Sequence, residues 1–167
     1  VLLAEKLLVD SGNNDPVLWA YVLDKKRWFS YELELWDEND AACNEMVRRL
    51  SQVSLWAYLP EHEVIRSSLR AAYHLLGGVK LDVTGEEREQ ALKEGLGLLK
   101  QAFALTAGSA EDESVNEPFY DTYLRLLMAL SQYDKSYHEP LEPLLETVRE
   151  FNWRHFIYPD DVTQPMG

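Results

Sequence analysis

The chain has 167 residues, 46% of them hydrophobic and 11% aromatic, which is the composition of a folded protein with one core. Its 16 lysines and arginines stand against 29 aspartates and glutamates, a formal net charge of −13. Nucleic acids and anionic membranes both attract positively charged surfaces, so this charge argues against either as a partner. It favours high solubility and a basic protein partner.

Cys43 is the single cysteine, which excludes an intrachain disulfide. It lies at helical spacing with Met46, Val47 and Leu50, a pattern that predicts a buried, unreactive thiol. The sequence has no run of about 18 apolar residues that would cross a membrane. We therefore expect a soluble protein of a reducing compartment, the cytoplasm. Because the chain begins at Val1 without a methionine, an upstream segment with a targeting signal is compatible with the sequence.

Two helices are predicted near the N-terminus. The first has an apolar face and ends at Gly12, because glycine is a common helix stop. The residues expected to face inward are Leu3, Leu7 and Leu8. The second begins at Pro16, since proline suits the first helical position and Asp15 can cap the helix start.

The segment from Phe29 to Leu35 fits two periods. Apolar and polar residues alternate as in a strand, but helical spacing also fits through Tyr31 and Trp36. Only one other short alternation exists, at residues 79–83, and two isolated strands make a marginal sheet. We favour a helix here, with a strand as the alternative.

Two further helices follow. The first is capped by Asn39 or Asp40 and ends before Pro60, because the residue before a proline disfavours the helical conformation. The second begins at Pro60 and stops at the pair Gly77 and Gly78.

The next helix opens with a capping box, in which the side chains of Thr84 and Glu87 bond the first backbone N–H groups. It closes at Gly108. Gly95 and Gly97 inside it each cost about 1 kcal/mol relative to alanine. We expect these glycines to let another helix approach closely.

Prolines mark the starts of the last two predicted helices. Pro118 lies near the start of one, and the first turn of the other contains Pro140 and Pro143. The residues that the last helix is expected to bury are Leu141, Leu144, Leu145 and Val148. Residues 152–167 are predicted to form an extended C-terminal tail.

These patterns predict a single all-α domain over residues 1–167, a bundle of about seven helices that are mostly antiparallel neighbours. A helical-pair repeat is an alternative, because "LWAYVL" at Leu18 and "LWAYLP" at Leu55 recur about 37 residues apart. A third copy is missing, so the match does not establish a repeat.

Motifs for catalysis and metal binding fail on their spacing. His62 begins a zinc-protease pattern, but Arg66 stands where the second histidine is needed. The acidic run that starts at Asp37 has Ala42 where a calcium loop needs glycine and Arg48 where it needs glutamate. We therefore predict no catalytic, cofactor-binding or metal-binding residues and no enzyme activity.

Aromatic residues are the remaining signal. Five tryptophans and nine tyrosines are more than a helical core needs, and large rings anchor protein interfaces. Trp19 and Trp56 lie on apolar stripes and are predicted to be core residues. The usual burial of tryptophan favours core packing for each remaining ring taken singly. Those with polar neighbours, and therefore better candidates for exposure, are Trp28, Trp36, Trp153 and Tyr158.

Rings and acids combine in "RWFSYELELWDEND", residues 27–40. We predict an acidic protein-binding module whose rings and carboxylates grip a basic protein partner. The most concrete form is an inhibitor or immunity-type protein that neutralises a basic partner such as a nuclease toxin. The predicted partner-binding residues are Trp28, Tyr31, Glu32, Glu34, Trp36, Asp37 and Glu38.

Two alternatives remain open, and the sequence leaves the oligomeric state open as well. A helical structural or adaptor subunit of a larger assembly predicts a more apolar exposed face. A small-ligand-binding protein or enzyme, with its site between helices, predicts a deep pocket lined by tyrosine and histidine and a titrating group with a perturbed pKa.

Overall fold

The computed structural model describes residues 1–54, 60–106 and 113–146. Within these ranges the chain forms six α-helices, two short 3-10 helices and a further helical segment at residues 141–146, and it has no strand. The predicted all-α class is therefore confirmed. None of the helices in these ranges combines the length and apolar character needed to cross a membrane.

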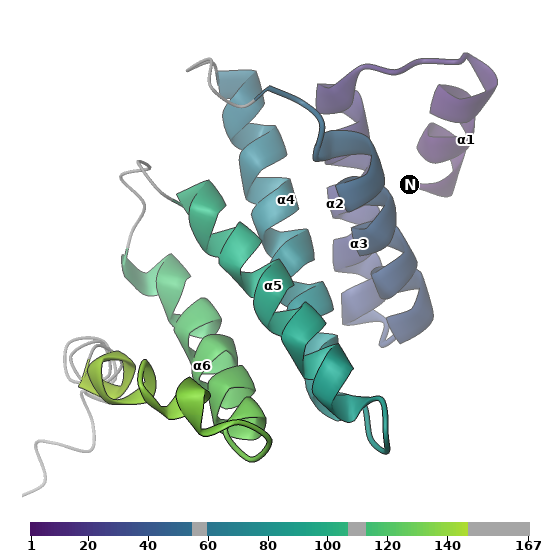
Figure 1. Cartoon of the computed structure of the whole chain (residues 1–167). Helices are drawn as coiled ribbons and strands as arrows, with labels where there is room; N and C mark the ends of the chain where they lie inside the picture. The colour runs from purple at the N-terminus through teal and green to yellow at the C-terminus, as the bar shows by residue number, and fades with distance from the viewer. Residues whose placement is uncertain (55–59, 107–112, 147–167) are drawn as a thin grey trace, which may run out of the picture.

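The helices form an array in sequence order (Figure 1). From α2 to α6 each helix packs antiparallel to the next, and α4 lies at the centre, where it also contacts α2 and α6. The elements are α1 (Leu2–Asp10), α2 (Pro16–Glu32), α3 (Trp36–Leu50), α4 (Pro60–Val79), η1 (Lys80–Asp82), α5 (Arg88–Thr106), α6 (Glu113–Leu130) and η2 (Lys135–His138).

One hydrophobic core runs through the array. Each helix from α2 to α6 contributes a stripe of side chains at helical spacing, and the helical segment at 141–146 adds Leu141 and Leu144. The largest side chains that are completely enclosed include Leu23, Met46, Leu50, Ile65, Leu69, Leu92, Leu99, Leu126, Leu127 and Leu130. Trp19 belongs to this core, as predicted, and its indole Nε1 donates to the carbonyl oxygen of Asn13 at 2.7 Å.

Helices α4 and α5 approach each other closely at Gly77 and Gly95. A Cβ atom on Gly95 would lie 2.9 Å from the carbonyl oxygen of Gly77 and 3.1 Å from Cδ2 of Leu126. The expectation of close helix packing is thus confirmed at Gly95. It is wrong at Gly97, where an added Cβ would meet nothing within 4 Å.

The segment at Phe29 to Leu35 is helical up to Glu32 and then turns, so the strand alternative is wrong. The capping prediction for α3 is also wrong. Its N-cap is Leu35, with no side-chain hydrogen bond at the cap, and the helix ends at Leu50, well before Pro60. Asn39 lies inside the helix instead of capping it.

The capping box at Thr84 does not mark the start of α5, which begins four residues later at Arg88. Gly85 has φ +84°, a left-handed backbone conformation that breaks the helical path between η1 and α5. The Arg88 guanidinium then donates to the carbonyl oxygens of Leu81 at 2.9 Å and Val83 at 2.6 Å, which ties η1 to the start of α5.

Other helix ends also shift from their predicted positions. α4 continues through Gly77 and Gly78 to Val79, and α6 begins at Glu113, before Pro118. The end of α1 near Gly12 is confirmed, with Gly12 at φ +64°. Residues 107–112 lie outside the described ranges, and the predicted end at Gly108 falls among them.

Predicted burial fails at both ends of the described chain. Leu3 and Leu7 are 71% and 59% exposed, because among the described elements α1 packs only against α2, and none of its residues is buried. Leu145 is exposed as well, whereas Leu141 and Leu144 are buried. Three predictions fall outside the described residues: the burial of Val148, the tail at 152–167, and the repeat, whose second copy lies there except for Pro60.

Candidate functional site

Six large apolar side chains are exposed where α2 turns into α3, and we call this set the aromatic corner. The side chains are Trp28, Phe29, Tyr31, Leu33, Leu35 and Trp36. Trp28 is 46% exposed and Trp36 55%, in contrast to Trp19 at 2%. Two ring pairs organise the corner: Trp28 meets Phe29 edge-on with centroids 5.0 Å apart, and Tyr31 meets Trp36 at 5.6 Å.

A tight turn holds the corner in shape. The backbone N–H of Leu33 donates to the carbonyl oxygen of Phe29, and that of Leu35 donates to Ser30 at 2.8 Å. Glu34, between them, has φ +57°, the left-handed conformation that favours glycine. The turn therefore fixes the backbone between α2 and α3, at the point where these apolar side chains are exposed.

Substitutions at Glu34 test this turn. Glu34→Gly should give a protein about 1 kcal/mol more stable than Glu34→Ala, because an L side chain pays roughly that amount in the left-handed region. Both variants lose the same charge, so the comparison isolates the backbone. The free energy of unfolding in urea measures the difference, and equal stabilities would mean that residue 34 does not hold this conformation.

A buried amide joins the two helices behind the corner. Asn39, only 4% exposed, donates from Nδ2 to the carbonyl oxygen of Arg27 at 2.9 Å. Its Oδ1 faces the thiol of Cys43 at 3.8 Å. Cys43 is completely buried, as predicted, and burial is the main cause that raises the pKa of its thiol to about 12.

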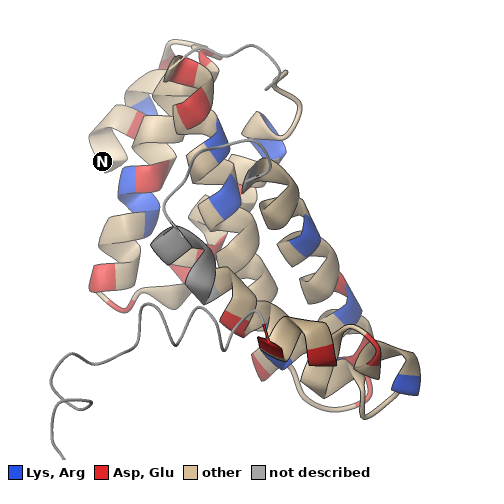
Figure 2. Ribbon diagram, turned by 90° about the vertical axis from the view of Figure 1, so that its left-hand side faces the viewer, with Lys and Arg blue, Asp and Glu red and all other residues tan. Residues whose placement is uncertain are grey.

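Four carboxylates lie beside the corner, and no described cation forms an ion pair with them. Within the described ranges no ion pair involves Glu32, Glu34, Asp37 or Glu38, and all four are exposed. Two nearby cations are paired with other carboxylates: Lys26 binds Glu5 at 2.7 Å and Arg27 binds Asp24 at 2.8 Å. A third, Lys25, lies over the Trp28 ring, with its Nζ 5.9 Å from the ring centroid. On the side shown in Figure 2, lysines and arginines are scattered over several helices and form no single basic face.

All seven predicted partner-binding residues thus lie at one end of the α2–α3 hairpin. Tyr31 and Trp36 are in direct ring contact, and Trp28 is one helical turn from Tyr31. The sequence did not point to Phe29, Leu33 and Leu35 as part of this surface. Their exposure depends on where the turn falls. The exposure candidates Trp153 and Tyr158, and the core candidate Trp56, lie outside the described residues.

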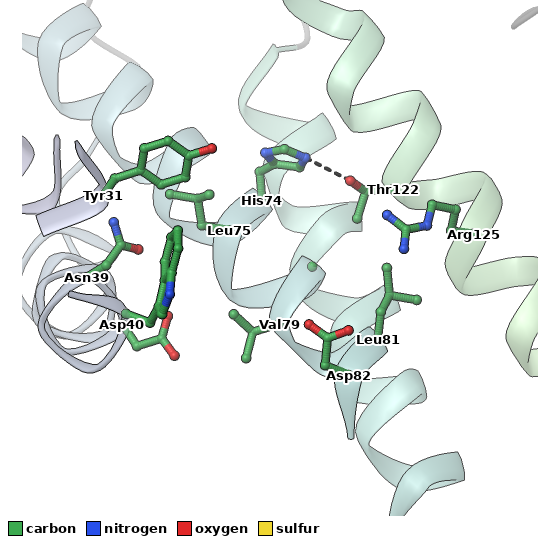
Figure 3. Close-up of a pocket in the computed structure, with 12 residues that line it drawn as sticks. Tyr31, Asn39, Asp40, His74, Leu75, Val79, Leu81, Asp82, Thr122 and Arg125 are labelled. Carbon is green, nitrogen blue, oxygen red and sulfur yellow. Dashed lines mark hydrogen bonds between the residues drawn. The ribbon is translucent and has the colours of Figure 1, made fainter. Parts of the chain in front are cut away.

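A pocket of about 540 Å³ opens next to the corner, between α3 and α6, with the C-terminal half of α4 beneath it. Tyr31 lies on one side of the pocket and Arg125 of α6 on the opposite side (Figure 3). Trp36 also lines the pocket. In the pocket wall, Nε2 of His74 lies 2.9 Å from the hydroxyl oxygen of Thr122, which links α4 to α6.

Asp40 is the half-buried carboxylate of this pocket. Its pKa is raised above the ordinary range, mainly because burial removes water from the ionised group and also because Asp37 is nearby. Lys80 opposes these effects in part. Proton binding to Asp40 is therefore easier in the folded chain than in the unfolded chain.

Asp40→Asn should stabilise the protein at neutral pH, by less than about 1 kcal/mol because the group is partly solvated. With a raised native pKa, the native state binds more protons than the unfolded state between the two pKa values, so Asp40 lowers stability as pH rises through that range. The difference in the free energy of unfolding between Asp40→Asn and wild type should therefore shrink as the pH is lowered from about 7 to about 4. Urea unfolding at stepped pH measures it, and a destabilised Asn variant at neutral pH would contradict it.

Spacing along the sequence did not reveal this pocket, because its lining comes from helices far apart in the chain. His74 and Thr122 are separated by 48 positions. In the described part of the chain, no group of three or more His, Cys, Asp or Glu side chains is arranged to hold a metal ion.

Comparisons with known proteins add no family to this picture. No protein-family model matches the chain, and neither does any curated protein or solved structure with which it was compared. The geometry of the corner and the pocket is therefore the basis for inferring a function.

Proposed function

We propose that this chain is a protein-binding module that recognises a basic protein through the aromatic corner and its flanking carboxylates. The observation that carries the proposal is the joint exposure of four rings and two leucines at one turn. Monomeric soluble proteins rarely expose contiguous apolar groups of this size unless the surface binds something. Tryptophan and tyrosine are also the residues that contribute most to binding energy at interfaces.

The charge of the surface supports a basic partner. Glu32, Glu34, Asp37 and Glu38 surround the rings without ion-pair partners in the described chain, and the whole protein has a net charge of −13. Such a rim attracts and orients a cationic protein, and it disfavours an acidic one. The specific form that we propose is an inhibitor or immunity-type protein that neutralises its partner by covering a basic site.

The test is capture of the partner by the full chain from an extract of its source cells, at low and at high salt. A variant with Glu32, Glu34, Asp37 and Glu38 changed to their amides is compared with the control Glu139→Gln/Glu142→Gln, two exposed acids outside the corner. We expect a basic protein that wild type and control both bind, that high salt releases, and that the corner variant fails to bind. Equal capture by both variants would contradict the proposal.

A second candidate is a helical subunit of a larger assembly, and α1 favours it. This helix exposes Leu2, Leu3, Leu7 and Val9 on a surface that the described chain leaves uncovered. The double variant Leu3→Ser/Leu7→Ser separates the two candidates. Loss of a salt-resistant complex in this variant, with the corner variant unaffected, supports the assembly subunit.

A further inference from the structure

The pocket beside the aromatic corner shares two rings with it, so the two form one continuous surface. Tyr31 and Trp36 belong to the corner and also line the pocket. The volume of about 540 Å³ is in the range of cavities that take a side chain or a small molecule. A partner that covers the corner therefore lies at the mouth of the pocket.

The end of the pocket next to the corner suits a positive charge. Asp40 lines it, is half-buried, and forms no ion pair within the described chain. Lys80, whose charge partly lowers the pKa of Asp40, is itself paired with Glu94 at 3.5 Å. A cation placed here would relieve both the lost hydration of Asp40 and its repulsion by Asp37, the two causes that raise the pKa of Asp40.

The rings at the same end favour a guanidinium over an ammonium group. Tyr31 and Trp36 meet edge to face, at an interplanar angle of 82°, and both rings line the pocket. A guanidinium is planar and stacks on aromatic faces. It is also more weakly hydrated than an ammonium, so it loses less hydration free energy when it enters the pocket. Its several N–H donors can also bond a carboxylate with two hydrogen bonds.

Groups at the other end of the pocket restrict where the cation can lie. Arg125 is on the side opposite Asp40 (Figure 3) and repels a second positive charge there. His74 and Thr122 are already bonded to each other between the two ends. Asp82 adds a second carboxylate to the lining, which keeps the pocket attractive to cations despite Arg125.

We propose that this pocket is a guanidinium site that receives an arginine side chain of the basic partner, with Asp40 as its counter-ion and the Tyr31 and Trp36 rings as its walls. This inference rests on the proposed function, because the arginine is supplied by the protein that covers the corner. Trp28 belongs to the corner but does not line the pocket, so the two ideas can be tested by different residues.

The first experiment titrates the isotope-labelled full chain with N-acetyl-arginine methylamide and follows NMR signals of the Trp36 indole, the Asn39 amide and Gly78. We expect saturable shifts with the arginine compound, and at least about tenfold weaker binding of the citrulline and lysine counterparts. Asp40→Asn should weaken arginine binding about tenfold, whereas the control Glu142→Gln should not. Equal binding of citrulline, or no effect of Asp40→Asn, would overturn the site.

The second experiment identifies the source of the guanidinium by competition for the captured partner. If the partner supplies it, saturating arginine compound and Asp40→Asn each weaken capture about tenfold or more. If the compound binds but capture is unchanged, the pocket serves a free small molecule and the assignment to the partner is wrong. A different result would contradict the proposed function. In that case Trp28→Ala captures the partner as well as wild type does, while the arginine compound still binds the pocket.

Discussion

Gly95→Ala should lower the free energy of unfolding by about 2 kcal/mol, although alanine is normally the better helix former. A Cβ at this position would lie 2.9 Å from the carbonyl oxygen of Gly77 and 3.0 Å from Cβ of Lys80. A backbone atom cannot move aside as the end of a side chain can, so α4 and α5 must separate. Overpacking of this kind costs about 1 to 3 kcal/mol, more than the gain of about 1 kcal/mol in helix propensity.

Gly97→Ala is the matched control, two residues away in the same helix. The position is exposed and an added Cβ meets nothing within 4 Å, so only helix propensity acts. This variant should be more stable than wild type by about 0.5 to 1 kcal/mol. Urea denaturation of the two variants measures both effects, and a Gly95→Ala protein as stable as Gly97→Ala would contradict the close approach of α4 and α5.

The second large effect is expected at the rings of the aromatic corner. Trp28→Ala and Trp36→Ala should each weaken binding of the partner by about 2 kcal/mol, or roughly thirtyfold, because buried tryptophans dominate interface energies. Their cost to folding should be about 2 kcal/mol, since about half of each side chain is already in water and only the other half loses its burial. Titration calorimetry with the captured partner, together with urea unfolding, separates the two quantities.

Exposed side chains elsewhere provide the control for the ring variants. Met128 and Tyr133 are 53% and 46% exposed, comparable to the two tryptophans, but they belong to the α6 region. Met128→Ala and Tyr133→Ala should leave partner affinity unchanged. If they weaken binding as much as the tryptophan variants do, the aromatic corner is not the binding surface.

Local periodicity was sufficient to predict which segments are helical, because each buried stripe repeats within a few turns. It placed Trp19 among apolar residues in the core. The polar neighbours of Trp28 and Trp36 made exposure a candidate for them, although the usual burial of tryptophan favoured the core for each ring taken singly. The start of α3 was missed for a physical reason. The turn at Leu33 to Leu35 depends on a left-handed Glu34, and glutamate gives no hint of that conformation in a sequence.

Tertiary features were beyond reach of the same reasoning. The inward positions predicted for Leu3 and Leu7 assumed that α1 has a neighbour on that side, and the described chain provides only α2. The pocket could not be predicted, because its lining residues Asp40, His74 and Arg125 come from three different helices and lie around one cavity only in the folded chain. That the corner and pocket bind a basic protein stays a prediction until a partner is captured.

The weak attachment of α1 sets the order in which the structure opens. A helix of nine residues is marginal by itself in water, and this one is held mainly by Leu8 against the core and by the Glu5–Lys26 pair. Its amide hydrogens should therefore exchange with solvent deuterium long before those of α4, through a local opening that leaves the core intact. Each such opening frees the ammonium group of Lys26, one turn from Phe29, and briefly makes that end of the hairpin less negative.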